Sequence, residues 1–116
     1  MTFDEMIHSD KPVLVDFFAE WCLGCHELDQ NVFSKPEIQT KLAQVTALRV
    51  DATNIDDPLI QKLIDKYSII GLPTVLFLDE NGQEIKQVRM EGAGSIDEFK
   101  TSMRTWAEQA KINFKE

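Results

Sequence analysis

Residues 13–25 read VLVDFFAEWCLGC, and this stretch decides the fold. Its first part, residues 13–18, is almost wholly apolar and rich in β-branched and aromatic side chains. That composition predicts a strand buried on both faces, as in a sheet that helices cover on each side. A helical pattern then runs from Cys22 to about Asn31. The stretch therefore predicts a buried strand that leads into a helix beginning at the first of two cysteines.

The next segments alternate between helix and strand. Ser34 opens a Ser-x-x-Glu capping box, which predicts a second helix over residues 34–43. Residues 45–51 have the composition of another strand. Asp57 followed by Pro58 is typical of an N-cap and the first residue of a helix. This order of elements indicates an α/β domain.

The C-terminal part of the chain adds two strands and a closing helix. Residues 74–78 predict a buried strand, and the Asn-Gly pair at 81–82 predicts a hairpin turn into a polar edge strand over 84–90. Ser95 opens a second capping box. The expected core side chains of the helix that follows are Ile96, Phe99, Met103 and Trp106. We therefore expect one α/β domain over residues 1–116, with a central mixed sheet of about four strands and helices on both faces.

The composition excludes some classes of function. Acidic residues number 20 against 12 basic ones, and the net charge of −8 disfavours a nucleic-acid partner. The longest apolar run, residues 69–78, is about half of the roughly 20 residues that a membrane-spanning helix needs. Residues 1–5 lack the basic and apolar regions of a signal peptide. We expect either a cytosolic protein or a domain of a longer chain.

The most informative residues are the only two cysteines, Cys22 and Cys25. A disulfide closing so short a loop restrains little chain entropy, which makes a stapling role a poor explanation. A zinc site needs more ligands, and the only other soft ones are His8 and His26. A sulfur at a helix N-terminus faces free backbone N–H groups, which favour the thiolate. The pattern favours a redox pair in which Cys22 attacks and Cys25 resolves, over a zinc site or an inert pair of thiols.

Two separate motifs resemble the thioredoxin superfamily: residues 15–25 (VDFFAEWCLGC) and residues 70–74 (IGLPT). The resemblance extends over about residues 12–106. Residues 25–37 (CHELDQNVFSKPE) and 51–54 (DATN) most resemble the C-terminal periplasmic domain of DsbD-type thiol:disulfide interchange proteins. The resemblance implies a thioredoxin-like fold.

The resemblance also implies the site residues. The implied catalytic residues are Cys22, Cys25, Asp16 and Asp29, and the implied partner-binding residues are Trp21, Leu72 and Pro73. The resemblance implies that Cys22 is the exposed attacking cysteine and that Cys25 is the buried resolving one. Pro73 matches the cis-proline beside the pair, and the Leu72 backbone pairs with the partner's extended chain. The chain departs from ordinary thioredoxins at residues 23–24, where Leu-Gly replaces Gly-Pro.

The acids and Trp21 can also be weighed on physical grounds. A carboxylate in an apolar strand has a raised pKa, so Asp16 can move the proton of Cys25, unless it is solvated or hydrogen-bonded at the strand end. Asp29 is four residues after Cys25 and shares its helix face, although it can also be an ordinary solvated carboxylate. Trp21 either forms a docking surface or simply packs. We interpret His26 as a surface histidine.

The implied function is that of a protein-disulfide reductase, which needs no metal or organic cofactor because the two thiols carry both electrons. As a DsbD-type domain, the chain would pass electrons from a membrane-embedded domain to an N-terminal periplasmic domain. It would be a monomeric, soluble periplasmic part of an inner-membrane protein. The alternatives are a free-standing cytosolic thioredoxin and a redox-silent module that holds peptides at Leu72 and Pro73.

Overall fold

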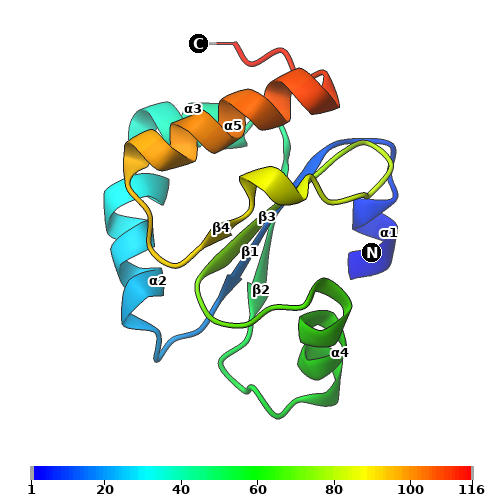
Figure 1. The fold of residues 1–116 in the computed structure, drawn as a ribbon, viewed down its shortest axis with the longest axis vertical. Coiled ribbons are helices and arrows are strands. Elements are labelled where there is room, and N and C mark those ends of the chain that lie inside the picture. Colours follow the sequence, from blue (N-terminus) through cyan, green and yellow to red (C-terminus); the bar gives the residue numbers. More distant parts are fainter. Residues whose placement is uncertain (1, 116) are drawn as a thin grey trace.

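The computed structural model describes residues 2–115. In chain order its elements are α1 (Phe3–Ile7), β1 (Val13–Phe18), α2 (Leu23–Leu28), the π-helix η1 (Asp29–Phe33), α3 (Pro36–Leu42), β2 (Thr46–Asp51), α4 (Pro58–Tyr67), β3 (Thr74–Leu78), the 3-10 helix η2 (Lys86–Val88), β4 (Met90–Glu91) and α5 (Ile96–Ala110). The four strands form one sheet in the order β2-β1-β3-β4. Strands β1 and β2 run parallel, whereas the other two neighbouring pairs run antiparallel. Helices cover both faces (Figure 1), so the predicted fold class is confirmed.

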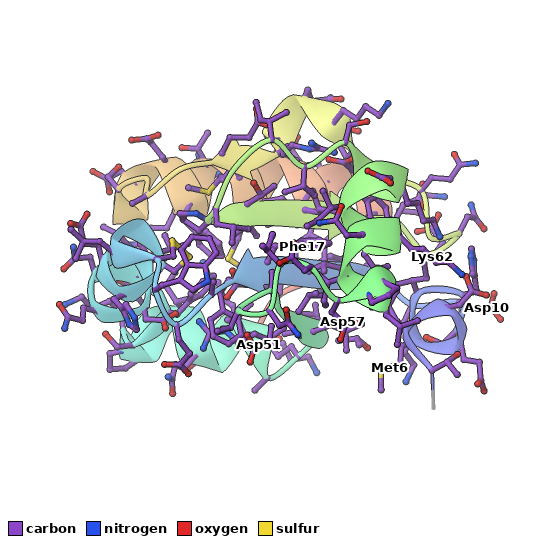
Figure 2. The ribbon with its side chains drawn as sticks, turned by 90° about the horizontal axis from the view of Figure 1, so that it is seen from below. Met6, Asp10, Phe17, Asp51, Asp57 and Lys62 are labelled. Atoms are coloured by element: carbon purple, nitrogen blue, oxygen red, sulfur yellow. A yellow bond between two sulfur atoms is a disulfide. The ribbon has the colours of Figure 1, made fainter. Side chains whose placement is uncertain are left out.

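Strand β1 lies in the interior of the sheet, and its side chains alternate between two cores. Leu14 packs into the core that α2, η1, α3 and α5 share, whereas Phe17 packs into the core below α1 and α4. Figure 2 shows Phe17 in the interior, and Asp10 and Lys62 at the outer edge of the molecule. Because alternate residues of a strand face the same side, Asp16 lies on the Leu14 side, toward α2.

Two predicted helix starts are confirmed. Asp57 is the N-cap of α4, and its carboxylate accepts a hydrogen bond from the Leu59 N–H at 2.8 Å. Ser95 and Glu98 form the predicted capping box of α5, in which the Ser95 hydroxyl accepts from the Glu98 N–H at 3.1 Å. The α5 side chains buried in the core are Phe99, Met103, Trp106 and Ala110.

The predicted capping box at Ser34 is wrong. Lys35 is the N-cap of α3, and the Ser34 hydroxyl donates instead to the Gln30 carbonyl oxygen at 2.6 Å. The cysteine helix continues beyond its predicted end through η1, where the Ser34 N–H donates to the Asp29 carbonyl oxygen at 2.8 Å. Ser34 therefore keeps a helical backbone and cannot take the extended conformation that an N-cap requires.

The predicted polar edge strand is also wrong over most of its length. The turn is present, with Gly82 at φ 78°, and an isolated bridge joins Leu78 to Glu84. The chain then forms η2, and only two residues pair as β4. The reason is packing: Ile85 and Val88 are three residues apart and are both buried in the same core. A helical turn places such residues on one side, whereas a strand would place them on opposite sides.

Candidate active site

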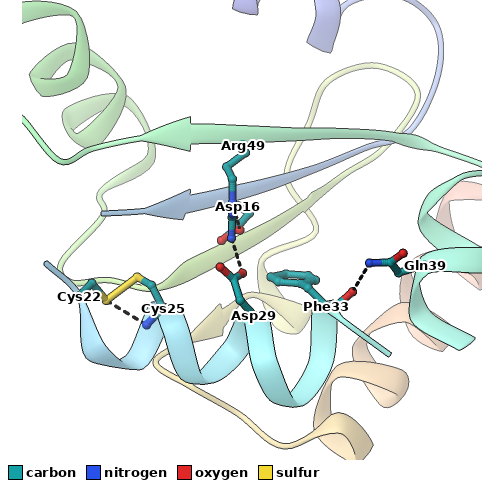
Figure 3. Close-up of polar contacts among 7 residues, drawn as sticks. All are labelled: Asp16, Cys22, Cys25, Asp29, Phe33, Gln39 and Arg49. Atoms are coloured by element: carbon teal, nitrogen blue, oxygen red, sulfur yellow. Dashed lines mark hydrogen bonds and ion pairs between the residues drawn. A yellow bond between two sulfur atoms is a disulfide. The ribbon is translucent and has the colours of Figure 1, made fainter. Parts of the chain in front are cut away.

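Cys22 and Cys25 lie just after β1 at the start of α2 and are joined as a disulfide. Their Cα atoms are 5.2 Å apart, as in ordinary disulfides. Cys22 is the N-cap of α2, and its Sγ accepts a hydrogen bond from the Cys25 backbone N–H at 3.1 Å (Figure 3). A backbone donor in this position favours the thiolate of Cys22 once the disulfide is reduced. The pair can therefore alternate between a disulfide and a dithiol.

The two cysteines differ in exposure less than expected. Cys22 exposes 6% of its surface and Cys25 exposes 2%. The prediction of an exposed Cys22 is therefore wrong, and only the order of exposure agrees with it. Ala19 and Leu72 pack against the pair, and the cap hydrogen bond holds Cys22 Sγ against the first turn of α2. A partner must fit closely around Cys22 to reach its sulfur.

The loop before β3 lies against the cysteine helix. The Leu72–Pro73 peptide bond is cis, as predicted. A Cβ atom built on Gly24 would lie 3.2 Å from Pro73 Cδ, so the glycine between the cysteines lets the proline ring lie close to the start of α2. The Gly92 N–H donates to the Pro73 carbonyl oxygen at 2.8 Å and holds this loop in place. A cis-proline loop thus borders the cysteine pair, and the partner-binding role of Leu72 and Pro73 stays a prediction.

Large exposed apolar side chains flank these two segments. Trp21 is 60% exposed, Leu23 is 73% exposed, and Ile70, two residues before Leu72, is 85% exposed. The Trp21 ring does not simply pack, and its Nε1 donates to the Thr53 carbonyl oxygen at 2.9 Å. Exposed apolar side chains beside a reactive group are typical of a surface that contacts a partner. The sequence prediction included Trp21 but missed Leu23 and Ile70.

Asp16 and Asp29 meet at one basic side chain, Arg49 (Figure 3). Arg49 Nε donates to Asp16 Oδ2 at 3.0 Å, and Arg49 Nη2 donates to Asp29 Oδ1. The guanidinium also lies 4.1 Å from the centroid of the Phe18 ring. Asp29 is therefore half-buried and paired with a cation, unlike an ordinary solvated carboxylate.

The sequence prediction missed Arg49, although a signal for it exists. In the parallel pairing of β1 with β2, Asp16 lies opposite Arg49. A carboxylate in a buried strand needs a cation or hydrogen-bond donors, and the facing position on a neighbouring strand can supply one. Arg49 is the only basic residue of the predicted strand 45–51, which made it the candidate partner, but the register that sets it beside Asp16 comes from the structure.

Asp16 is a buried acid, as predicted. Of the alternative, a solvated carboxylate is wrong, whereas the hydrogen-bonded carboxylate agrees with the structure, in which Arg49 is the donor. Burial raises the pKa of Asp16 to about 6, although the charge and hydrogen bond of Arg49 oppose this increase. Its side chain is 8% exposed, and Oδ1 has no hydrogen-bond partner among the residues that the structure describes. An acid with a pKa close to neutrality and one free oxygen is suited to taking up and releasing a proton.

The remaining predicted features lie outside this cluster. His26 is exposed, and its Nε2 lies 2.7 Å from the Glu20 carbonyl oxygen, in keeping with a surface histidine. Within residues 2–115, no three His, Cys, Asp or Glu side chains are grouped so that they could hold a metal ion. Over the same range, no helix has the length and apolar character needed to span a membrane.

Several known proteins resemble this chain in sequence. The thiol:disulfide interchange protein DsbD of Photorhabdus laumondii is 40% identical over 85 residues, which are 73% of this chain and 15% of that protein. DsbD of Escherichia coli K12 is 36% identical over 94 residues, which are 81% of this chain and 16% of that protein. The chain thus spans less than a fifth of the length of these relatives.

Solved structures and a family model also match this chain. A thioredoxin from Thermus thermophilus matches with a TM-score of 0.74 and 25% identity, over 91% of this chain and 80% of that one. The oxidised C-terminal domain of Neisseria meningitidis DsbD matches with a TM-score of 0.70 and 28% identity, over 92% of this chain and 86% of that one. The family model of the thioredoxin-like domain matches residues 1–107. The chain therefore belongs to the thioredoxin-like family.

Proposed function

We propose that this chain is a thiol-disulfide oxidoreductase that reduces partner disulfides through Cys22 and Cys25. The observation that carries this function is the disulfide at the N-terminus of α2, where the Cys25 backbone N–H donates a hydrogen bond to Cys22 Sγ. The cis-proline loop beside the pair and the similarity to DsbD proteins support the same chemistry.

The reaction consists of two exchanges. In the reduced protein, the Cys22 thiolate attacks one sulfur of a partner disulfide, and the other partner sulfur leaves as a thiolate. Cys25 then loses its proton, and its thiolate attacks Cys22 Sγ and releases the second partner sulfur. The partner gains two electrons and two protons, and this chain returns to the Cys22–Cys25 disulfide. A dithiol donor restores the reduced form by the reverse exchange.

Asp16 assists the second exchange as a proton acceptor. It faces α2 from β1, and burial holds its pKa at about 6. An acceptor with this pKa is ionised for much of the time at neutral pH and can take the proton from Cys25. Asp29 acts with Asp16 through the shared Arg49.

The chain takes the place of the C-terminal domain in a DsbD-type relay. It receives electrons from a membrane-embedded domain and gives them to an N-terminal periplasmic domain, and it acts in the periplasm as a monomeric domain. The similarity to the DsbD C-terminal domain and to the DsbD sequences supports this placement. The similarity to Thermus thermophilus thioredoxin favours a second candidate, a free-standing thioredoxin.

Cys25→Ser tests the relay. This variant keeps the attacking sulfur but cannot resolve, so we expect it to accumulate a mixed disulfide with the oxidised N-terminal domain of a DsbD-type protein. Non-reducing electrophoresis and mass spectrometry would detect the complex, which dithiothreitol would release. Cys22→Ser is the matched control and is expected to form no complex.

Two other outcomes would contradict parts of the proposal. Rapid reduction of the wild-type disulfide by NADPH and a flavin thioredoxin reductase, without a mixed disulfide to the DsbD domain, would indicate a thioredoxin instead. A wild-type protein that reduces neither insulin nor the DsbD domain would contradict the oxidoreductase function and leave a peptide-binding module.

A further inference from the structure

Arg49 joins the two acids of the site into one unit. Its Nε donates to Asp16 on β1, and its Nη2 donates to Asp29 on η1, so a single planar group spans two elements. Asp29 follows Cys25 by four residues, which places both on the side of the helix that faces Asp16 (Figure 3). These three residues, Asp16, Arg49 and Asp29, form a clamp that connects the sheet to the helix that holds the resolving cysteine.

We infer that Arg49 is a positioning residue, which holds Asp16 and Asp29 in one fixed arrangement and thereby sets the pH range in which Cys25 resolves mixed disulfides. This inference rests on the proposed function, because it concerns the second exchange. Arg49 acts through Asp16 and does not touch the reacting sulfurs.

The charges around Asp16 make Arg49 the dominant partner. The charged groups that act on Asp16 are Arg49 from β2 and Asp29 from η1. The nearest titratable group of α2 on this side of the helix is Cys25 once its disulfide is reduced, four residues before Asp29. Its neighbour on β3 is the apolar Val75. Arg49 is the cation of this group, and it lowers the pKa of Asp16 against the effects of burial and of Asp29. Removing Arg49 therefore raises the pKa of Asp16 further.

The clamp also borders a route to solvent. Asp16 and Arg49 line an open groove of about 420 Å³, together with Phe33 and Leu42. The Arg49 side chain is 43% exposed, whereas that of Asp16 is 8% exposed. Arg49 thus lies between the buried acid and water, where it can hold the Asp16 carboxylate in place while a proton leaves through the groove.

The test measures the resolving step directly. Reduced protein is mixed with glutathione disulfide, and acid quenching with mass spectrometry follows the disappearance of the Cys22–glutathione mixed disulfide from pH 5 to pH 9. For Arg49→Gln we expect the midpoint of the pH profile to rise by about one unit, since an adjacent opposite charge typically lowers a carboxyl pKa by one to three units. On the low-pH side this corresponds to a roughly tenfold slower step.

Three further variants separate positioning from a structural effect. Arg49→Lys keeps the charge but lacks the planar fork, so we expect a smaller rise of the midpoint, and it serves if Arg49→Gln does not fold. Arg104→Gln removes an exposed arginine of α5 and is expected to match the wild type. In an Asp16→Asn background, Arg49→Gln is expected to cause no further shift, because the two residues act together.

The results distinguish this inference from the proposed function. If wild-type protein never resolves the mixed disulfide, the proposed function fails. If wild-type protein resolves it and both Arg49 variants keep the wild-type midpoint, only the role of Arg49 is overturned. A shift of the same size in the Asp16→Asn background would also overturn it, since Arg49 would then act on another group.

Discussion

Cys22→Ser is expected to abolish the reduction of insulin disulfides, with the rate falling to that of the dithiothreitol electron donor alone. The serine hydroxyl has the same position at the N-cap of α2, but it does not form the thiolate that attacks a disulfide. Turbidity of the precipitating insulin chains measures the rate. Serine is also a good N-cap residue, so the fold and the helix start should be preserved.

The control for this result is the folded state of the variant, checked by far-UV circular dichroism and urea unfolding against reduced wild-type protein. Reduced protein is the right reference, because the variant cannot form the Cys22–Cys25 disulfide. Residual insulin reduction by folded Cys22→Ser, clearly above the dithiothreitol background, would contradict the assignment of Cys22 as the attacking sulfur.

Asp16→Asn is expected to stabilise the oxidised protein above pH 6 by up to about 3 kcal/mol relative to its effect at pH 3.5. The pKa of Asp16 is about 6 in the folded protein and 3.8 in the unfolded reference, so the folded state binds the extra proton between these values. Wild-type stability therefore falls as the pH rises through this window. Asparagine does not titrate, and its carbonyl oxygen can still accept the Arg49 hydrogen bond.

Urea unfolding from pH 3.5 to pH 8 measures this difference. Glu27→Gln removes an exposed carboxylate of α2 and should follow the wild-type curve at every pH. Parallel curves for wild type and Asp16→Asn between pH 4 and pH 7 would show that Asp16 titrates normally.

The Asp16→Asn variant should also slow the resolving exchange at pH 7 by at least about tenfold, as expected for the loss of a proton acceptor.

Much of the fold could be predicted because local signals agree with the tertiary structure. The apolar run 13–18, the Asp-Pro start of α4 and the capping box at Ser95 each specify an element by themselves. The turn signal at residues 81–82 was correct, but the strand expected over residues 84–90 is wrong. Ile85 and Val88 pack into one core, and this packing imposes a helical turn. Such an override depends on the partner surface and cannot be read from the segment alone.

Residues of the site that lie close together in the sequence were predicted from the sequence itself, the distant Pro73 was predicted only from the family resemblance, and the distant Arg49 was missed. Cys22, Cys25 and Asp16 lie within ten residues of one another, and the sequence places them on one strand and one helix. Arg49 reaches Asp16 only through the register of β1 with β2, which the sequence does not specify. The low exposure of Cys22 likewise depends on Leu72, fifty residues further along the chain.

Alkylation is the most direct test of the claim that Cys22 is the attacking sulfur and Cys25 the resolving one. Fully reduced wild-type protein is treated briefly with limiting iodoacetamide near pH 7, and peptide mass spectrometry locates the added carbamidomethyl group. Modification mainly at Cys22, with Cys25 reacting only after unfolding, is the predicted outcome. Equal labelling of both thiols, or faster labelling of Cys25, would contradict it.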